Sequence, residues 1–307
     1  MLPPTHVLLI LLASCVAAVS LPAVARDSLK IVATTSDLRS LAEAVGGARV
    51  AASHIVPPVV DPEDYQPHPN DLRRLRDADM VVRVGLDFDL WLDQALAQSG
   101  NKAIAKGGPG YVDASLAIAL LDVRGGGLGG GDGHAHGTGN PHYWLDPMNA
   151  EIITGHVLET LARIDPAGAR DYDARRVAFL KRLREKLPEW EAQLAAARRR
   201  PLIVQHNTWS YFERRFRLQV AGTIELRPGV PAGPAHLAAL LQQMRERSVA
   251  VIVRQPHEPE RSARFLADRT GARIAVLAGS VQSVPQASDF IALFDYNVAA
   301  LAAAFGK

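Results

Sequence analysis

The sequence predicts an α/β fold with two βα lobes, each containing a mainly parallel sheet, bridged by a long helix. Short β-branched runs alternate with amphipathic segments along both halves of the chain, which is typical of βαβ units. The chain also has 307 residues, more than one average core accommodates, so two lobes are expected. We place the N-terminal lobe at 26–165, the connecting helix at 166–200 and the C-terminal lobe at 201–307.

In the first half, turn residues bound each predicted element. Gly47 ends the first helix, the pair Asp61-Pro62 ends the second strand, and Asp165-Pro166 ends the last helix of this half. Hydrophobic periodicity places strands at 29–35, 50–60 and 80–84, and helices at 37–47, 70–78, 87–97 and 150–164.

The second half repeats the alternation after a long helical segment at 169–199. Apolar residues recur in this segment at spacings of three and four and form one stripe, which consists of Leu180, Leu183, Leu187, Trp190 and Leu194. Pro188 lies inside the stripe, and we expect it to kink the helix or to split it near Lys186. Strands follow at 202–204, 219–224, 249–253 and 273–277, and helices at 209–216, 234–247, 260–270 and 290–305. Ligand loops at the carboxyl ends of the strands would line a cleft between the lobes.

Composition and charge favour a soluble globular protein. Hydrophobic residues make up 48% of the chain and charged residues 21%, and the net charge is +2. Basic residues are dispersed except for Arg198-Arg199-Arg200 at an expected helix end, so we expect no nucleic-acid partner. We expect the protein to be a monomer.

The N-terminus is typical of a secreted protein. Residues 7–19 are almost wholly apolar, and Ala23-Val24-Ala25 offers the small residues that signal peptidase requires, which predicts a signal peptide over 1–25. The alternative is a lipoprotein, because Leu12-Ala13-Ser14-Cys15 is similar to a bacterial lipobox. Cys15 is the only cysteine, so after cleavage at Ala25 any metal would have to be held by His, Asp and Glu.

A glycine-rich segment at 125–139 carries two histidines, His134 and His136. So much glycine cannot bury enough apolar surface to offset its ordering entropy, so we expect the segment to stay mobile. Imidazoles on a mobile tether are typical of transient metal capture, since histidine is the commonest protein metal ligand. The alternative is a solvated spacer with two incidental histidines.

Four potential metal ligands, Glu63, His142, His206 and His257, lie in separate loops at the expected ends of strands. Ligands from four loops suit a site in a cleft, because each loop can present one donor without distorting its strand. Several other histidines, His54, His156 and His236, fall within predicted strands or helices and are expected to be structural. The pattern therefore predicts a metal site.

The sequence from 29 to 305 resembles the periplasmic metal-binding proteins of zinc and manganese ABC transporters, the cluster A-I solute-binding family. The resemblance is carried by Asp61-Pro62-Glu63-Asp64-Tyr65-Gln66-Pro67, Gly85-Leu86, Pro141-His142-Tyr143-Trp144-Leu145-Asp146-Pro147, Gln205-His206-Asn207 and Tyr296-Asn297. It implies two α/β lobes bridged by a long helix, with the metal in the cleft between them. It also implies a non-enzymatic protein that captures a divalent metal in the periplasm and delivers it to a membrane permease.

Two departures from this family bear on the ligands. Glu63 stands where the family usually has a histidine after Asp-Pro, and His68 could substitute for it. The aspartate that usually follows the last strand is missing from Leu277-Ala278-Gly279-Ser280. We expect His257 to replace this aspartate as a ligand, with Glu258 and Glu225 as the next candidates.

The ligand types favour zinc, because imidazole-rich, four-coordinate sites suit this ion. Manganese is the alternative and would be favoured by more carboxylates and a larger coordination number. A zinc hydrolase with an open metal position is a second alternative, although the chain has no His-Glu-x-x-His motif. A metal-buffering or adhesin-like role on the same fold is a third.

Overall fold

Two parallel four-stranded sheets form the framework of the protein. The structure, a computed structural model, describes residues 28–306 except 61, 64, 124–138 and 227–229. The first sheet has the order β2-β1-β3-β4 and is built from β1 (Leu29–Ala33), β2 (Val50–His54), β3 (Met80–Arg83) and β4 (Tyr111–Asp113). The second has the equivalent order β6-β5-β7-β8 and is built from β5 (Pro201–Val204), β6 (Gln219–Thr223), β7 (Val251–Arg254) and β8 (Arg273–Val276). The predicted two-lobed α/β class is confirmed.

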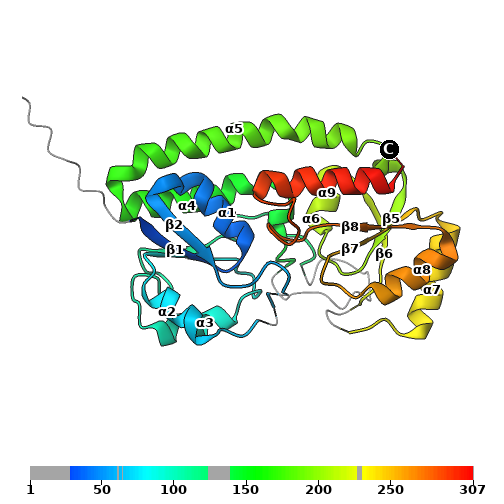
Figure 1. Cartoon of the computed structure of the whole chain (residues 1–307), viewed down its shortest axis with the longest axis horizontal. Coiled ribbons are helices and arrows are strands. Elements are labelled where there is room, and N and C mark those ends of the chain that lie inside the picture. Colours follow the sequence, from blue (N-terminus) through cyan, green and yellow to red (C-terminus); the bar gives the residue numbers. More distant parts are fainter. Residues whose placement is uncertain (1–27, 61, 64, 124–138, 227–229, 307) are drawn as a thin grey trace, which may run out of the picture.

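Helices cover both faces of each sheet (Figure 1). One face of the first sheet packs on α2 (Pro69–Arg76) and α3 (Trp91–Ser99), and one face of the second packs on α7 (Pro234–Glu246) and α8 (Glu260–Thr270). The opposite faces meet the other α-helices, which are α1 (Ser36–Gly46), α4 (Ala150–Ile164), α5 (Ala169–Gln193), α6 (Ser210–Phe216) and α9 (Phe290–Ala304). Successive strand residues face opposite sides, so Ile31 and Ala33 join one core while Val32 joins the other.

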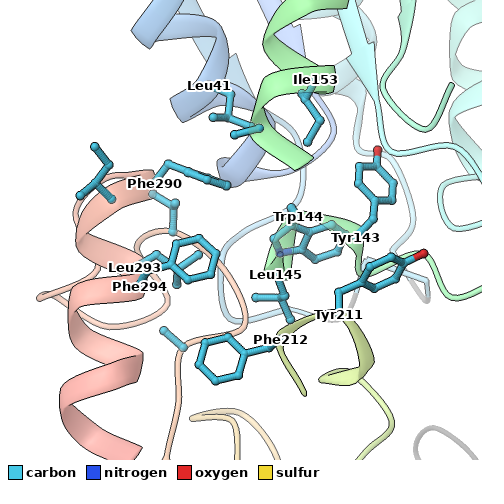
Figure 2. Packing of buried hydrophobic residues seen from close by; sticks show 14 of the residues in the cluster. Leu41, Tyr143, Trp144, Leu145, Ile153, Tyr211, Phe212, Phe290, Leu293 and Phe294 are labelled. Carbon is cyan, nitrogen blue, oxygen red and sulfur yellow. The ribbon is translucent and has the colours of Figure 1, made fainter. Parts of the chain in front are cut away.

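One apolar cluster runs through both lobes and joins them. Figure 2 shows Trp144 and Leu145 lying between side chains of α1 and α4 on one side and those of α6 and α9 on the other. The rings of Phe212 and Phe294 stack with centroids 6.3 Å apart. Because this core is continuous across the lobes, it holds the two sheets in a defined relative position.

Helix α5 spans both lobes along one side of the molecule (Figure 1). Its buried face includes Leu180, Leu183 and Trp190, as the apolar stripe predicts. Trp190 packs on Phe294 of α9 with ring centroids 5.3 Å apart. Of the two outcomes expected at Pro188, a kink or a split near Lys186, the split does not occur, and the helix continues through the proline. This proline lies on the exposed side of the helix, where water can satisfy the carbonyl that it leaves without a donor.

Several elements differ from the sequence-based expectation, and three of the differences have a clear local cause. Strand β2 ends at His54 and not at 60, since two prolines follow at 57 and 58 and cannot donate to a ladder. Helix α3 begins at Trp91 and not at 87, because residues 85–87 adopt positive φ. Strand β4 was not predicted, because its three residues are too few to show a periodicity.

Candidate metal centre

Three potential ligands converge at the carboxyl ends of the strands. Glu63, His142 and His206 each offer one donor atom, and these atoms all lie within 4.8 Å of one another. Glu63 lies in the loop between β2 and α2, His142 precedes the short 3-10 turn Tyr143–Leu145, and His206 follows β5 by two residues. Side chains at this separation could each contact one metal ion at about 2.0–2.2 Å. The arrangement therefore suits a single cation held by both lobes.

The two histidines line a cavity of about 240 Å³ between the lobes. His142 is 8% exposed and His206 is 9% exposed, and the centroids of their rings are 6.1 Å apart. The ring of Phe88 meets His142 edge-on at 5.3 Å, and the ring of Trp144 lies at the same centroid distance. These aromatic walls limit the access of water, which strengthens electrostatic attraction between a cation and the ligands.

A strained turn places Phe88 against His142. Gly85, Leu86 and Asp87 follow β3 with φ of 77°, 54° and 63°, a conformation that costs energy at the two non-glycine positions. The buried carboxylate of Asp89 supports the turn, because it accepts hydrogen bonds from the backbone N–H of Val84 at 2.7 Å and of Gly85 at 3.2 Å. Strain maintained in this way next to a cavity is typical of a functional site.

The C-terminal lobe adds two buried carboxylates to the cavity wall. Glu225 accepts a hydrogen bond from Nε2 of Gln205 at 2.8 Å. Glu258 accepts one from Nε2 of Gln255 at 3.3 Å, and that nitrogen also donates to Oγ1 of Thr208 at 3.2 Å. The pKa of Glu258 is raised to about 7, mainly by burial and in smaller part by the neighbouring charge of Glu225. These groups make the wall favourable to a cation.

The loop after β8 approaches this wall closely. Gly279 and Ser280 line the cavity, and a Cβ atom on Gly279 would lie 1.8 Å from Oε1 of Gln255. Only glycine therefore fits at 279 without displacing Gln255. Ser280 lies in the loop after the last strand, where the family that this sequence resembles usually has an aspartate ligand.

The remaining candidate ligands have different positions. His257 borders the same cavity with an exposed side chain, but it is outside the group of three donors found among the described residues. His68 is exposed at the N-cap of α2, where its backbone N–H donates to Oδ2 of Asp71 at 2.8 Å, and it is also outside that group. His134 and His136 lie outside the described residues.

Two of the three histidines expected to be structural, His156 and His236, contact backbone carbonyl oxygens through their rings. Nε2 of His156 lies 2.9 Å from the carbonyl oxygen of Leu116, and Nε2 of His236 lies 2.9 Å from that of Thr223. The pKa of His54 is lowered to about 4, mainly by burial and in smaller part by the charges of Arg39 and Arg74. Asn140, which touches the ring of His142, was not singled out in the sequence, although it lies only two residues before that histidine.

A family model and two known proteins resemble this chain over different shares of its length. The sequence model of the family described as the periplasmic zinc-uptake complex component A matches residues 31–304. The manganese-binding lipoprotein MntA of Halalkalibacterium halodurans is 26% identical over 223 residues, which cover 72% of this chain and 68% of that protein. The high-affinity zinc uptake system protein ZnuA of Brucella abortus is 29% identical over 136 residues, 44% of this chain and 41% of that protein.

Solved structures show the same fold. A crystal structure of ZnuA superimposes with a TM-score of 0.76 and 24% identity, covering 91% of this chain and all of that one. The structure of a cadmium-bound periplasmic metal-binding protein from Candidatus Liberibacter asiaticus gives a TM-score of 0.75 at 16% identity over 91% of this chain and all of that one. At these identities the likeness concerns the fold alone.

Proposed function

This chain belongs to the family of periplasmic zinc-uptake complex component A proteins, and on that premise we propose that it captures zinc and delivers it to the membrane permease of an ABC transporter. The observation that carries the proposal is the convergence of one carboxylate and two imidazoles within 4.8 Å at the inter-lobe cavity. Such a donor set suits zinc at neutral pH, where histidine is largely uncharged.

We propose Glu63, His142 and His206 as the ligands, with His257 as the fourth. His257 lies in the loop after β7 and borders the same cavity, so a rotation of its side chain could bring it to the ion without moving the strand. His68 is the alternative to Glu63 for the first position. Manganese is the alternative ion, because the buried Glu225 and Glu258 add oxygen donors nearby, and the relative MntA is named for manganese.

The shared core bears on how the ion could enter and leave. Glu63 and His142 belong to the first half of the chain and His206 to the second, so separating these loops would break the coordination. A large hinge motion would expose the continuous apolar core between the lobes, which is unfavourable. We therefore infer that the loops around the cavity, and not whole-lobe rotation, carry capture and release.

We also propose a periplasmic location and a binding role without turnover. The predicted signal peptide at 1–25 lies outside the described residues, as does Cys15, the site of the alternative lipid anchor. Within the described ranges, no helix combines the length and apolar character that a bilayer span requires. Hydrolysis of peptide or ester reporters by the zinc-loaded protein would contradict a binding role.

Native mass spectrometry with metal analysis tests the proposal directly. We expect one zinc ion per chain in the wild type, and loss of this ion in His142→Ala, His206→Ala and Glu63→Ala. His156→Ala is the matched control, because it removes a histidine that lies away from the cavity. A zinc ion retained in Glu63→Ala but lost in His142→Ala would move the first position to His68 or leave a site of three histidines. A wild type that holds no metal would refute the proposed function.

A further inference from the structure

Asn140 is buried beside the candidate metal centre and contacts both of its histidine loops. It is 3% exposed and lies on the N-terminal side of His142. Its Oδ1 accepts a hydrogen bond from the backbone N–H of His142 at 2.9 Å and lies 3.1 Å from Nδ1 of the same residue. Its Nδ2 donates to Oδ2 of Asp122 at 3.0 Å and to the carbonyl oxygen of Asn207 at 3.0 Å. Asn207 directly follows His206.

These partners determine which way the amide of Asn140 points. A carboxylate and a carbonyl oxygen can only accept hydrogen bonds, so the NH2 group must face Asp122 and Asn207. A backbone N–H can only donate, so Oδ1 must face His142. In the reversed amide, the NH2 group would face the N–H of His142, and the amide oxygen would face the oxygens of Asp122 and Asn207. That orientation is therefore unfavourable.

The orientation of Asn140 in turn determines the tautomer of His142. A neutral imidazole carries one N–H, and the nitrogen that faces an acceptor oxygen is the one that keeps the proton. With Oδ1 fixed at 3.1 Å from Nδ1, the proton resides on Nδ1 and the lone pair on Nε2. Ligating histidines commonly hold their orientation through such a hydrogen bond from the other ring nitrogen.

We propose that Asn140 is a positioning residue for metal capture, which selects the Nδ1-protonated form of His142 and presents its Nε2 to the ion. The same side chain ties the His142 loop to the backbone after His206 and so sets the separation of the two imidazoles. Ser210 supports it, because its hydroxyl donates to Oδ2 of Asp122 at 2.7 Å. This inference rests on the proposed role of His142 as a ligand.

The tautomer can be measured without metal. The full chain, labelled with 15N-histidine, is stripped of metal and studied at about pH 8, where imidazole is neutral. Long-range 1H–15N correlations then distinguish the two ring nitrogens, and His142→Ala identifies the signals of His142. We expect the Nδ1-protonated form in the wild type and a mixture of tautomers in Asn140→Ala. The opposite tautomer in the wild type would overturn the inference, even if every variant at 140 failed to fold.

Zinc affinity provides the second measurement. We expect Asn140→Ala to weaken zinc binding by about 10- to 100-fold, the usual effect of removing a partner of a metal ligand. Asn149→Ala is the matched control, because Asn149 is also buried and donates to the carbonyl oxygen of Tyr143 at 2.8 Å, a hydrogen bond that does not involve the imidazole. It should keep the tautomer and the affinity.

The outcomes separate the inference from the proposed function. An unchanged tautomer and affinity in Asn140→Ala, or equal changes in Asn149→Ala, would overturn the role of Asn140. Zinc binding that survives in His142→Ala would refute His142 as a ligand and would overturn the inference with it. A wild type that holds no zinc would instead refute the proposed function, whatever the tautomer of His142.

Discussion

A buried carboxyl group at the lobe interface should make the stability of the protein depend on pH. Asp37 lies in the first turn of α1, is fully buried, and accepts a hydrogen bond from the backbone N–H of Val281 at 2.8 Å. Burial raises its pKa from 3.8 to about 7, because the charged form loses its hydration. The perturbation that we consider is Asp37→Asn, which is neutral at every pH and keeps an oxygen for Val281.

The sign and size of the effect follow from proton linkage. The folded protein holds a proton on Asp37 that the unfolded chain has lost between about pH 4 and pH 7, so the free energy of unfolding falls as the pH rises through this range. The loss levels off about one pH unit above the folded pKa, near pH 8. Since a tenfold change in proton affinity is worth about 1.4 kcal/mol, the full effect is about 4 kcal/mol.

Urea unfolding of the metal-free proteins between pH 4 and pH 8 measures this effect. The stability of Asp37→Asn relative to the wild type should rise by about 4 kcal/mol across the range, because the variant cannot ionise. Other buried acids such as Glu258 are common to both proteins, so the difference isolates Asp37. Ser36→Ala is the matched control. It removes the neighbouring 2.7 Å hydrogen bond to the carbonyl oxygen of Val281 without a change of charge, and should cost about 1 kcal/mol at every pH. A difference between Asp37→Asn and the wild type that stays constant with pH would refute the reasoning.

Three further predictions concern other parts of the chain. Asp89→Ala should lower the free energy of unfolding by about 3–5 kcal/mol in urea titrations, because it removes the 2.9 Å buried partner of Arg83, which keeps only Asp93, and leaves the backbone N–H groups of Val84 and Gly85 without their acceptor; a loss below 1 kcal/mol would be inconsistent with this. Arg215→Lys should cost about 1–2 kcal/mol in the same assay, since it loses the two-point contact with Asp146 at 2.7 and 2.9 Å, and a neutral result would show that this contact adds nothing. Deletion of 125–139 should leave one zinc per chain but slow its association in stopped-flow measurements at low metal; an unchanged rate would reject a capture role for this segment.

Most helices and strands could be predicted from local patterns. Helix α8 has the predicted bounds, and α4 ends where Asp165-Pro166 follows it, because proline disfavours a helical conformation in the residue before it. The failures also have local causes. The turn at 85–87 is stabilised by the carboxylate of Asp89, so its positive φ values cannot be inferred from residue propensities alone.

The candidate ligands illustrate both the strength and the limit of sequence reasoning. Their expected position at strand ends singled out Glu63, His142, His206 and His257 as a group, because the carboxyl ends of parallel strands meet at one edge of a sheet. For His142 this expectation was wrong, since β4, the last described strand before it, ends at Asp113. Which of the four residues lie close enough to share one ion could not be predicted. Glu63, His142 and His206 come within 4.8 Å, whereas His257 only borders the cavity, and the ligand assignment remains a prediction.

By itself, the sequence determined the alternation of strands and helices, the long amphipathic helix and the loops that carry histidines, because these features depend on residue periodicity and on neighbours along the chain. Only the tertiary structure decided how the two sheets face each other. That arrangement depends on packing between distant segments, in which Trp144 and Phe212 occupy the core shared by both lobes. It also decided that Asn140 touches His142 and the backbone after His206, since that contact exists only once the lobes are in place.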